Sequence, residues 1–400
     1  MTGMRVASAL STAHDAPAAI EDIARQLRVA EERKPDFVAL HFAPVGALDE
    51  VQACAAERFG AAALHGGSSC RGVMTDAGLA MRDGRGMGAL AIWDPGGAYG
   101  TAMAELGSKP RDAARRAAHA ALHEAGRAGE APELVWLTSA PGAEEEVLVG
   151  LKDVLGPDAL IVGGSAADND VSGHWQQFCG AGTAHAAVVV SVLFPSQTIA
   201  CSYQSGYAPT RVHGTVTRCE GRRLMEIDGS PAADTYARWT AGAVPATPEA
   251  DRSILAESTF HPLGRETDTL AGVPFHLLAH PAVAHPDGAV SLFADVAPGE
   301  TLWLMEGSAE SLVARAGRVA AASREDLPER AVSGALVVYC GGCMLAVEDR
   351  MEDVRRGVAE RLGGAPFLGV FTFGEQGAPL GGEARHGNLM ISCSVFGQGP

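Results

Sequence analysis

One pattern of apolar blocks occurs twice in this chain, 97 residues apart, and this repeat limits the fold more than any other feature. Three blocks match without gaps at that single offset: Phe37–Pro44 with Leu134–Pro141, Leu64–Ser68 with Ile161–Ser165, and Met87–Trp93 with Ala184–Val190. Internal similarity at a fixed period decides the architecture before local patterns do. We therefore interpret residues 1–98 and 99–195 as two copies of one unit.

Each copy has the local pattern of a β-α-β unit. An apolar run of strand length ends in Ala-Pro, where proline removes a hydrogen-bond donor and ends the strand. A helical segment follows, over residues 48–59 or 144–155, and a second short strand then ends in Gly-Gly-Ser. Strand, helix and strand over about thirty residues predict a parallel pair. The later strands of each copy predict a β-α-β-β-β unit, so the N-terminal half is interpreted as an internal duplication.

The second half of the chain is less regular. Strands over 335–339 and 367–373 flank a Cys-Gly-Gly-Cys turn and a helix over 347–362. The whole order favours an α/β (α+β mixed) fold in which mixed sheets are covered by helices. Because no low-complexity linker separates the halves, we predict two domains that share an interface, residues 1–205 and 206–400.

Composition excludes several classes of partner. The chain has 31 Lys+Arg against 48 Asp+Glu, so its formal net charge of −17 argues against nucleic acid and anionic membrane surfaces. No apolar run has the roughly 18 residues of a membrane helix, and no signal peptide is seen. Eight irregularly spaced cysteines do not form a secreted disulfide pattern. We expect a cytoplasmic protein, and exposed edges of mixed sheets favour a homodimer.

The two Gly-Gly-Ser segments are the first candidate ligand-binding residues. Glycine at a strand end lets the backbone turn and present N–H groups to a ligand, and it is equally the default residue of a tight turn. The copies diverge directly after this motif, where only the first has a thiol and a guanidinium, a group that suits a carboxylate or a phosphate. The candidate residues here are Gly66, Gly67, Ser68, Ser69, Cys70, Arg71, Gly163, Gly164 and Ser165.

Two further groups lie in the second half. Cys340 and Cys343 have the spacing of a redox dithiol beside a helix start, or of two small residues that flank a glycine-rich turn. Zinc would need a second ligand pair, which the chain lacks. Gly374 and Glu375 end an apolar strand, where a carboxylate must be paired or contact a ligand. His386 and Asn388 follow within about a dozen residues. We expect these side chains to converge with Glu375.

These motifs resemble the FIST proteins, which carry an N-terminal and a C-terminal FIST domain in series. In the N-terminal part the resemblance rests on the strand that ends Phe42-Ala-Pro44 and on the segment 64–72. In the C-terminal part it rests on the segment 367–377, with its Gly-Glu-Gln-Gly, and on His386-Gly-Asn388. The chain departs from the family where Ser-Cys-Arg-Gly replaces a common acidic form of the N-terminal loop.

The resemblance implies a sensory module of bacterial signal transduction that binds a small molecule. We expect the pocket to lie between the two domains. The resemblance also implies a separate partner protein, such as a histidine kinase or a cyclic-dinucleotide enzyme. A haem-binding nitric-oxide sensor is an alternative within the family, and its axial ligand would be His386, His65 or Cys70, since haem needs such a side chain. An enzyme with Cys70 or Cys340 as nucleophile is the other alternative. We favour the sensor, because no nucleophile, base and orienting group can be recognised together.

Overall fold

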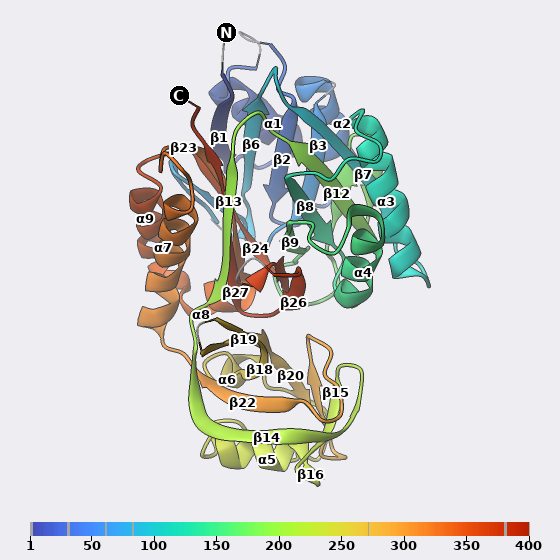
Figure 1. Cartoon of the computed structure of the whole chain (residues 1–400), viewed down its shortest axis with the longest axis vertical. Helices are drawn as coiled ribbons and strands as arrows, with labels where there is room; N and C mark the ends of the chain where they lie inside the picture. The colour runs from blue at the N-terminus through green and yellow to red at the C-terminus, as the bar shows by residue number, and fades with distance from the viewer. Residues whose placement is uncertain are drawn as a thin grey trace.

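The computed structural model describes residues 3–29, 33–60, 62–81, 84–270, 272–379 and 382–399. Figure 1 shows two bodies. The upper body holds three sheets with helices around them, and both chain ends lie at its top. The lower body is a smaller, mostly β module made from one continuous stretch in the middle of the chain.

Three mixed sheets with one common strand order form the upper body. The first sheet has the order β1 (Arg5–Ser11), β6 (Met87–Trp93), β2 (Phe37–Phe42), β3 (Ala63–Ser68), β10 (Gln177–Cys179) and β11 (Gly182–Ala184). The second has the order β7 (Ala98–Glu105), β12 (Ala187–Phe194), β8 (Leu134–Ser139), β9 (Ile161–Ser165), β25 (Glu375–Gly377) and β26 (Arg385–Gly387). The third has the order β13 (Ile199–Ser205), β27 (Met390–Gly397), β23 (Val332–Cys340), β24 (Phe367–Thr372), β4 (Val73–Thr75) and β5 (Gly78–Ala80).

Each sheet borrows its last two strands from a distant part of the chain. Its one parallel pair, β2 with β3, β8 with β9, or β23 with β24, stands third and fourth in the order. The hairpin β4–β5 leaves the first sheet and pairs with β24 of the third. Likewise β10–β11 pairs with β3 of the first sheet, and β25–β26 with β9 of the second. The three sheets are therefore linked in a ring.

Helices cover the outer faces of these sheets. They are α1 (Ala16–Gln26) and α2 (Leu48–Phe59), α3 (Pro110–Glu124) and α4 (Glu144–Leu155), and α7 (Ala309–Glu325), α8 (Gly341–Ala346) and α9 (Met351–Arg361), with the short 3₁₀ turn η2 (Glu348–Arg350). The side chain of Asp15 caps α1 by accepting from the Ala18 N–H, and Ser308 and Ser311 form a capping box at α7. Each helix pair buries an apolar core against its own sheet.

A further core lies between the sheets. Phe37 of β2, Trp136 of β8 and Leu336 of β23 are buried in one apolar cluster to which all three sheets contribute. Because these strands are buried on both faces, they are nearly continuous apolar runs. These apolar runs are the pattern from which the strands were predicted.

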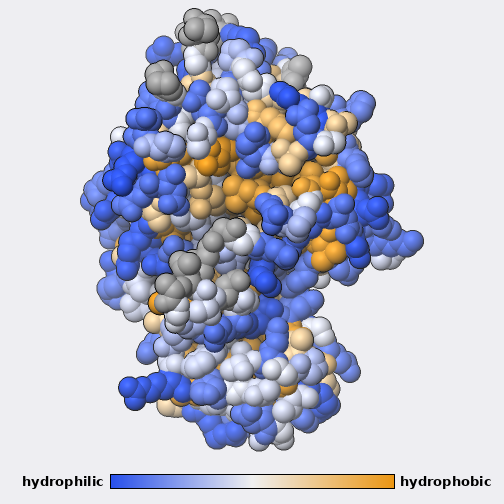
Figure 2. Space-filling view, viewed as in Figure 1, coloured by the Kyte–Doolittle hydropathy of each residue, from blue (hydrophilic) through white to orange (hydrophobic). Residues whose placement is uncertain are grey.

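The lower body is inserted between β13 and α7. It contains β14 (Ala208–Glu220), β15 (Arg223–Ile227), β16 (Ser230–Pro231), α5 (Ala232–Trp239), β17 (Arg252–Ser253), α6 (Leu255–Ser258), β18 (Leu263–Leu270), β19 (Val273–Ala279), β20 (Pro281–Ala284), β21 (Val290–Leu292) and β22 (Thr301–Glu306). Its own apolar core includes Tyr236 and Leu302. In the view of Figure 2, apolar side chains gather on the upper body, and the lower body is largely hydrophilic or neutral.

The mixed fold with helix-covered sheets confirms the prediction of fold class, and three local predictions are wrong. Both Gly-Gly-Ser segments are paired strand, in β3 and β9, and are not turns. The turn expected over residues 340–343 is instead the start of the helix α8 (Gly341–Ala346). The helix expected over 347–362 begins only at Met351, after η2. Among the described residues, no helix is both long and apolar enough to cross a membrane.

Candidate functional site

A cavity of about 320 Å³ lies where the two bodies meet. From the lower body it is lined by α6 and the residue after it, by Phe260, and by His280 and Phe293. From the upper body it is lined by α8 with Cys340 before it, by Thr372 at the end of β24 with Phe373 and Gly374 after it, by Asn388 and by Val171. Because the two walls come from different bodies, a bound molecule would touch both of them.

His280 is the cavity's most unusual polar group. Its side chain is buried, its ring is hydrogen-bonded to the backbone of Leu255, and Nε2 has no partner among the described residues. Burial lowers the pKa of His280 to about 4, so the ring is neutral at pH 7. A neutral ring whose proton is donated to the Leu255 carbonyl leaves the lone pair on Nε2 as an acceptor.

Asn388 fixes the backbone that carries His280. Its side-chain Oδ1 accepts from the His280 N–H at 3.1 Å, and its own backbone N–H donates to the Leu278 carbonyl at 3.0 Å. Since Oδ1 is used in this way, the group that Asn388 can offer to a ligand is its amide N–H₂. Asn388 is thus both a wall of the cavity and a link between the bodies.

The cysteine pair sits at the start of α8, and its thiols are not poised for nucleophilic attack. Cys340 lines the cavity, and burial together with its contact to Cys343 holds the pKa of its thiol well above the usual value. Cys343 is fully buried, with Sγ 3.7 Å from the hydroxyl of Tyr207. Burial also raises the pKa of Cys70 to about 12. The thiolate is the nucleophile in cysteine chemistry, and a raised pKa disfavours it. Cys340 and Cys70 therefore lack the environment that the enzyme alternative requires.

Glu375 lies directly behind the cavity wall. Its Oε1 accepts from the Thr372 hydroxyl at 2.8 Å, and its Oε2 accepts from the Met390 N–H at 2.9 Å. Burial, with Cys340 nearby, raises the pKa of Glu375 well above its usual value. The carboxyl group is therefore held inside the protein, where it fixes the segment after β24, and it does not line the cavity.

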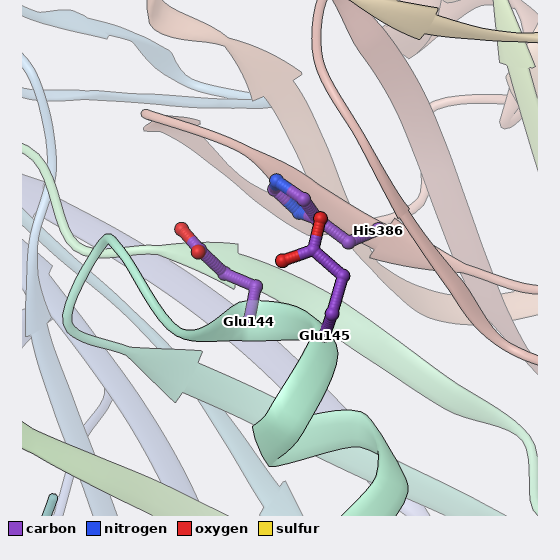
Figure 3. A group of neighbouring side chains, drawn as sticks. All are labelled: Glu144, Glu145 and His386. Carbon is purple, nitrogen blue, oxygen red and sulfur yellow. The ribbon is translucent and has the colours of Figure 1, made fainter. Parts of the chain in front are cut away.

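His386 converges on Glu144 and Glu145 instead of on Glu375, as Figure 3 shows. The ligand atoms of these three residues lie within 4.8 Å of one another, a set that could hold a metal ion. However, Arg222 already forms ion pairs with both carboxylates, at 2.6 Å from Glu144. Burial opposes ionisation, but the charges of His386 and Arg222 outweigh it and lower the pKa of Glu145 to about 2. The cluster is an ion pair network between the bodies, in which Arg222 also pairs with Asp295.

His65 and His386 do not fit a haem. Both ring nitrogens of His65 lie 2.8 Å from hydroxyls, those of Ser191 and Thr138, deep between the first and second sheets. The ring nitrogens of His386 contact Gln376 Nε2 at 3.1 Å and the Phe293 carbonyl at 3.0 Å. Neither residue lines the cavity, and neither does Cys70. No axial ligand is available at these three positions.

The Gly-Gly-Ser segments bring strands close together. A Cβ on Gly66 would lie 2.2 Å from the Phe178 ring, and one on Gly163 would lie 1.9 Å from the Leu137 carbonyl oxygen. Gly67 and Gly164 are similarly close to Thr138 and Thr372, side chains of neighbouring sheets. These glycines leave no room for a ligand and instead allow the sheets to pack.

The residues that follow these glycines have partners within the protein, and Ser69 and Cys70 connect the first sheet to the third. Ser68 accepts from the Gln176 N–H, and Ser165 donates to Glu144 at 2.7 Å. Ser69 accepts from the Phe371 N–H at 2.8 Å, and the Cys70 N–H donates to the Phe371 carbonyl at 2.9 Å. The remaining predicted residue, Arg71, pairs with Glu348 at 2.7 Å.

Of the predicted site residues, the structure brings Cys340, Gly374 and Asn388 to the cavity. His280 and the three phenylalanines that line the cavity were not predicted from the sequence. The one available signal, for His280 alone, is that His276, His280 and His285 cluster in a proline-rich segment. The signal was weak because the lining comes from two bodies that are far apart in the chain.

Comparison with known proteins assigns this architecture to a class of sensory proteins. Residues 36–230 match the family model of the FIST N domain, and residues 232–378 match that of the FIST C domain. The chain belongs to the FIST family, whose domains are sensory domains of signal transduction.

A curated relative and two solved structures are more distant. An uncharacterized protein of Methanocaldococcus jannaschii is 32% identical over 96 residues, which are 24% of this chain and 18% of that protein. The match thus spans less than a fifth of the relative's length. A cyanuric acid hydrolase from A. caulinodans is 10% identical, with 99% of this chain and 100% of that one covered, at a TM-score of 0.38. PurLQS from Thermotoga maritima is 7% identical over 98% and 72% of the two chains, with a TM-score of 0.22. Neither score supports an argument.

Proposed function

We propose that this FIST protein senses a small molecule that binds in the cavity between the two bodies, and that it passes the signal to a separate partner protein. The observation that carries the proposal is the apolar cavity between the bodies, which is lined by buried His280, a side chain whose Nε2 has no hydrogen-bond partner among the described residues. A buried polar group without a partner is costly, and a ligand that supplied the missing hydrogen bond would remove that cost.

The geometry also supplies a route for the signal. His280 and Phe293 belong to the lower body, whereas Cys340 and Thr372 belong to the upper body. A ligand that contacts both walls favours the arrangement in which they are close together, and a shift between arrangements is what a partner could recognise. The described cysteines are all free thiols, which supports a location in the reducing cytoplasm.

The test is a cavity-filling substitution. Ala346→Phe places a ring inside the cavity, and Ala53→Phe, on the exposed face of α2, makes the same chemical change elsewhere. A panel of small molecules is screened by thermal shift against the original protein and both variants. At a free concentration of 100 times Kd, a ligand stabilises the folded state by about 2.7 kcal/mol. We expect this shift in the original protein and in Ala53→Phe, and its loss in Ala346→Phe. Equal shifts in all three proteins would place the ligand outside the cavity.

A further inference from the structure

The cavity is lined without a single charged side chain. Its lining residues among the described parts of the chain include no Asp, Glu, Lys or Arg. Two carboxylates outside the lining already have partners: Glu375, directly behind the wall, is held by Thr372 and Met390, and Glu145 is paired with Arg222. A carboxylate or ammonium group in the cavity would therefore lose its hydration without gaining an opposite charge, which is unfavourable.

Aromatic and aliphatic groups form most of the wall. Phe260, Phe293 and Phe373 line it, together with Leu255. The ring of His280 meets that of Phe293 edge to face, with centroids 6.0 Å apart. Aromatic rings in such walls favour flat apolar molecules that can stack on a face or an edge. An apolar cavity of about 150 Å³ holds benzene, so about 320 Å³ has room for a molecule of two fused rings.

The exposed part of the lining includes apolar side chains as well. Leu345 and Val171 line the cavity, and they are 37% and 42% exposed. They are two of the four large hydrophobic side chains that are exposed in the described parts of the chain. Both side chains therefore extend the apolar lining toward the solvent.

Resting on the proposed sensory function, we infer that the ligand is an uncharged, largely apolar molecule of one or two rings. It carries one hydroxyl or N–H group, which donates to His280 Nε2. Amino acids and organic acids, which carry full charges at neutral pH, are excluded by the same lining.

Three naphthalene derivatives of nearly one shape test this inference by calorimetry on the full chain. Naphthol is neutral and donates a hydrogen bond, its methyl ether is neutral and cannot donate, and naphthoate is charged. We expect naphthol to bind about tenfold more tightly than the ether, because one hydrogen bond to a buried acceptor is worth about that factor. We expect naphthoate to bind at least tenfold more weakly than naphthol.

Two histidine variants test whether the hydroxyl of naphthol donates its hydrogen bond to His280 Nε2. His280→Phe removes the acceptor and keeps a ring, so the preference for naphthol over its ether should disappear. His276→Phe is the matched control. His276 lies in β19, the strand that ends directly before His280, and it packs on Trp303, outside the cavity. This variant should keep the tenfold preference. A preference that persists in His280→Phe would overturn the role of Nε2.

The outcomes separate this inference from the proposed function. Tight binding of naphthoate, of an amino acid, or of haem with a Soret band, each lost in Ala346→Phe, would overturn the uncharged ligand while leaving the cavity as the site. Binding that is unchanged in Ala346→Phe would overturn the cavity itself. Naphthol binding that is lost in Ala346→Phe and weakened about tenfold in His280→Phe supports both.

Discussion

The side-chain Oδ1 of Asn388 accepts a hydrogen bond from the His280 N–H, although the two residues are 108 positions apart and belong to different bodies. A second bond, from the Asn388 N–H to the Leu278 carbonyl, lies beside it. The pair therefore fastens the lower body to the upper body at the edge of the cavity. This link therefore couples ligand binding in the cavity to the relative position of the two bodies.

Asn388→Ala should loosen this link. The His280 N–H would lose its acceptor inside the protein, at a cost of about 1–3 kcal/mol. We expect faster hydrogen exchange in a peptide covering residues 276–284, measured by mass spectrometry. The core strand β8 is the internal control, and its exchange should change little. Unaltered protection around His280 would show that the side-chain bond does not hold this segment.

The Glu145 carboxylate should make the protein sensitive to acid. Its pKa of about 2 in the folded protein lies below the ordinary 4.5, so its stabilising effect is complete above pH 4.5 and is lost as the pH falls toward 2. By that difference, ionised Glu145 contributes about 3 kcal/mol at neutral pH. Glu145→Gln should remove this contribution and flatten the pH profile below 4.5, as followed by urea unfolding. Glu146→Gln, at the exposed neighbouring position, serves as the control and should keep the original profile.

Protonation of buried His41 should cause a second loss of stability on acidification, in a pH range above that of Glu145. Burial lowers its pKa to about 4, whereas the unfolded chain has the ordinary 6.5. Between these values the unfolded state binds more protons, so stability is full above pH 6.5 and falls as the pH decreases toward 4. His41→Leu should reduce this slope by up to about 3 kcal/mol across the window. His123→Leu changes an exposed histidine of α3 and should leave the slope unchanged. If both variants have the original slope, protonation of His41 is not coupled to unfolding.

Gly163→Ala distinguishes packing from ligand binding in the Gly-Gly-Ser segments. Its Cβ would lie 1.9 Å from the Leu137 carbonyl oxygen, a backbone atom that cannot move aside cheaply. We expect a loss of about 3 kcal/mol in the free energy of unfolding. Gly180→Ala, where no atom lies within 4 Å of the added Cβ, should be nearly neutral. A Gly163→Ala protein of normal stability that failed only in binding would return this motif to the ligand site.

The sequence allowed the local units to be predicted well. The helix expected over 48–59 is α2 (Leu48–Phe59), and the one expected over 144–155 is α4 (Glu144–Leu155). These elements follow from periodicity and from proline and glycine at their ends, which act over a few residues. The common strand order of the third sheet was not predicted. Its β24 reads Phe-Leu-Gly-Val-Phe-Thr where β3 and β9 have Gly-Gly-Ser, and the lower body is inserted directly after its first strand.

The cavity could not be predicted for a different reason. His280 and Cys340 are 60 residues apart in the chain, and their proximity depends on how the lower body docks on α8. No local pattern encodes that docking. Glu375 and His386 were expected to converge because they are near in sequence, but β25 and β26 place one behind the cavity and the other against α4. Side-chain direction alternates along a strand, so nearness in sequence does not give a shared site.

The exchange of hairpins among the three sheets also determines the order in which the chain can assemble. During synthesis from the N-terminus, residues 73–80 emerge early, yet the strand they pair with, β24, is made almost three hundred residues later. Strand β9 likewise has one unpaired edge until β25 is made. The first sheet can therefore form early, whereas the hairpin β4–β5 and the free edge of β9 stay unpaired until β24 and β25 are made. A nascent chain stalled before residue 367 would expose those edges to other chains, and such edges promote aggregation.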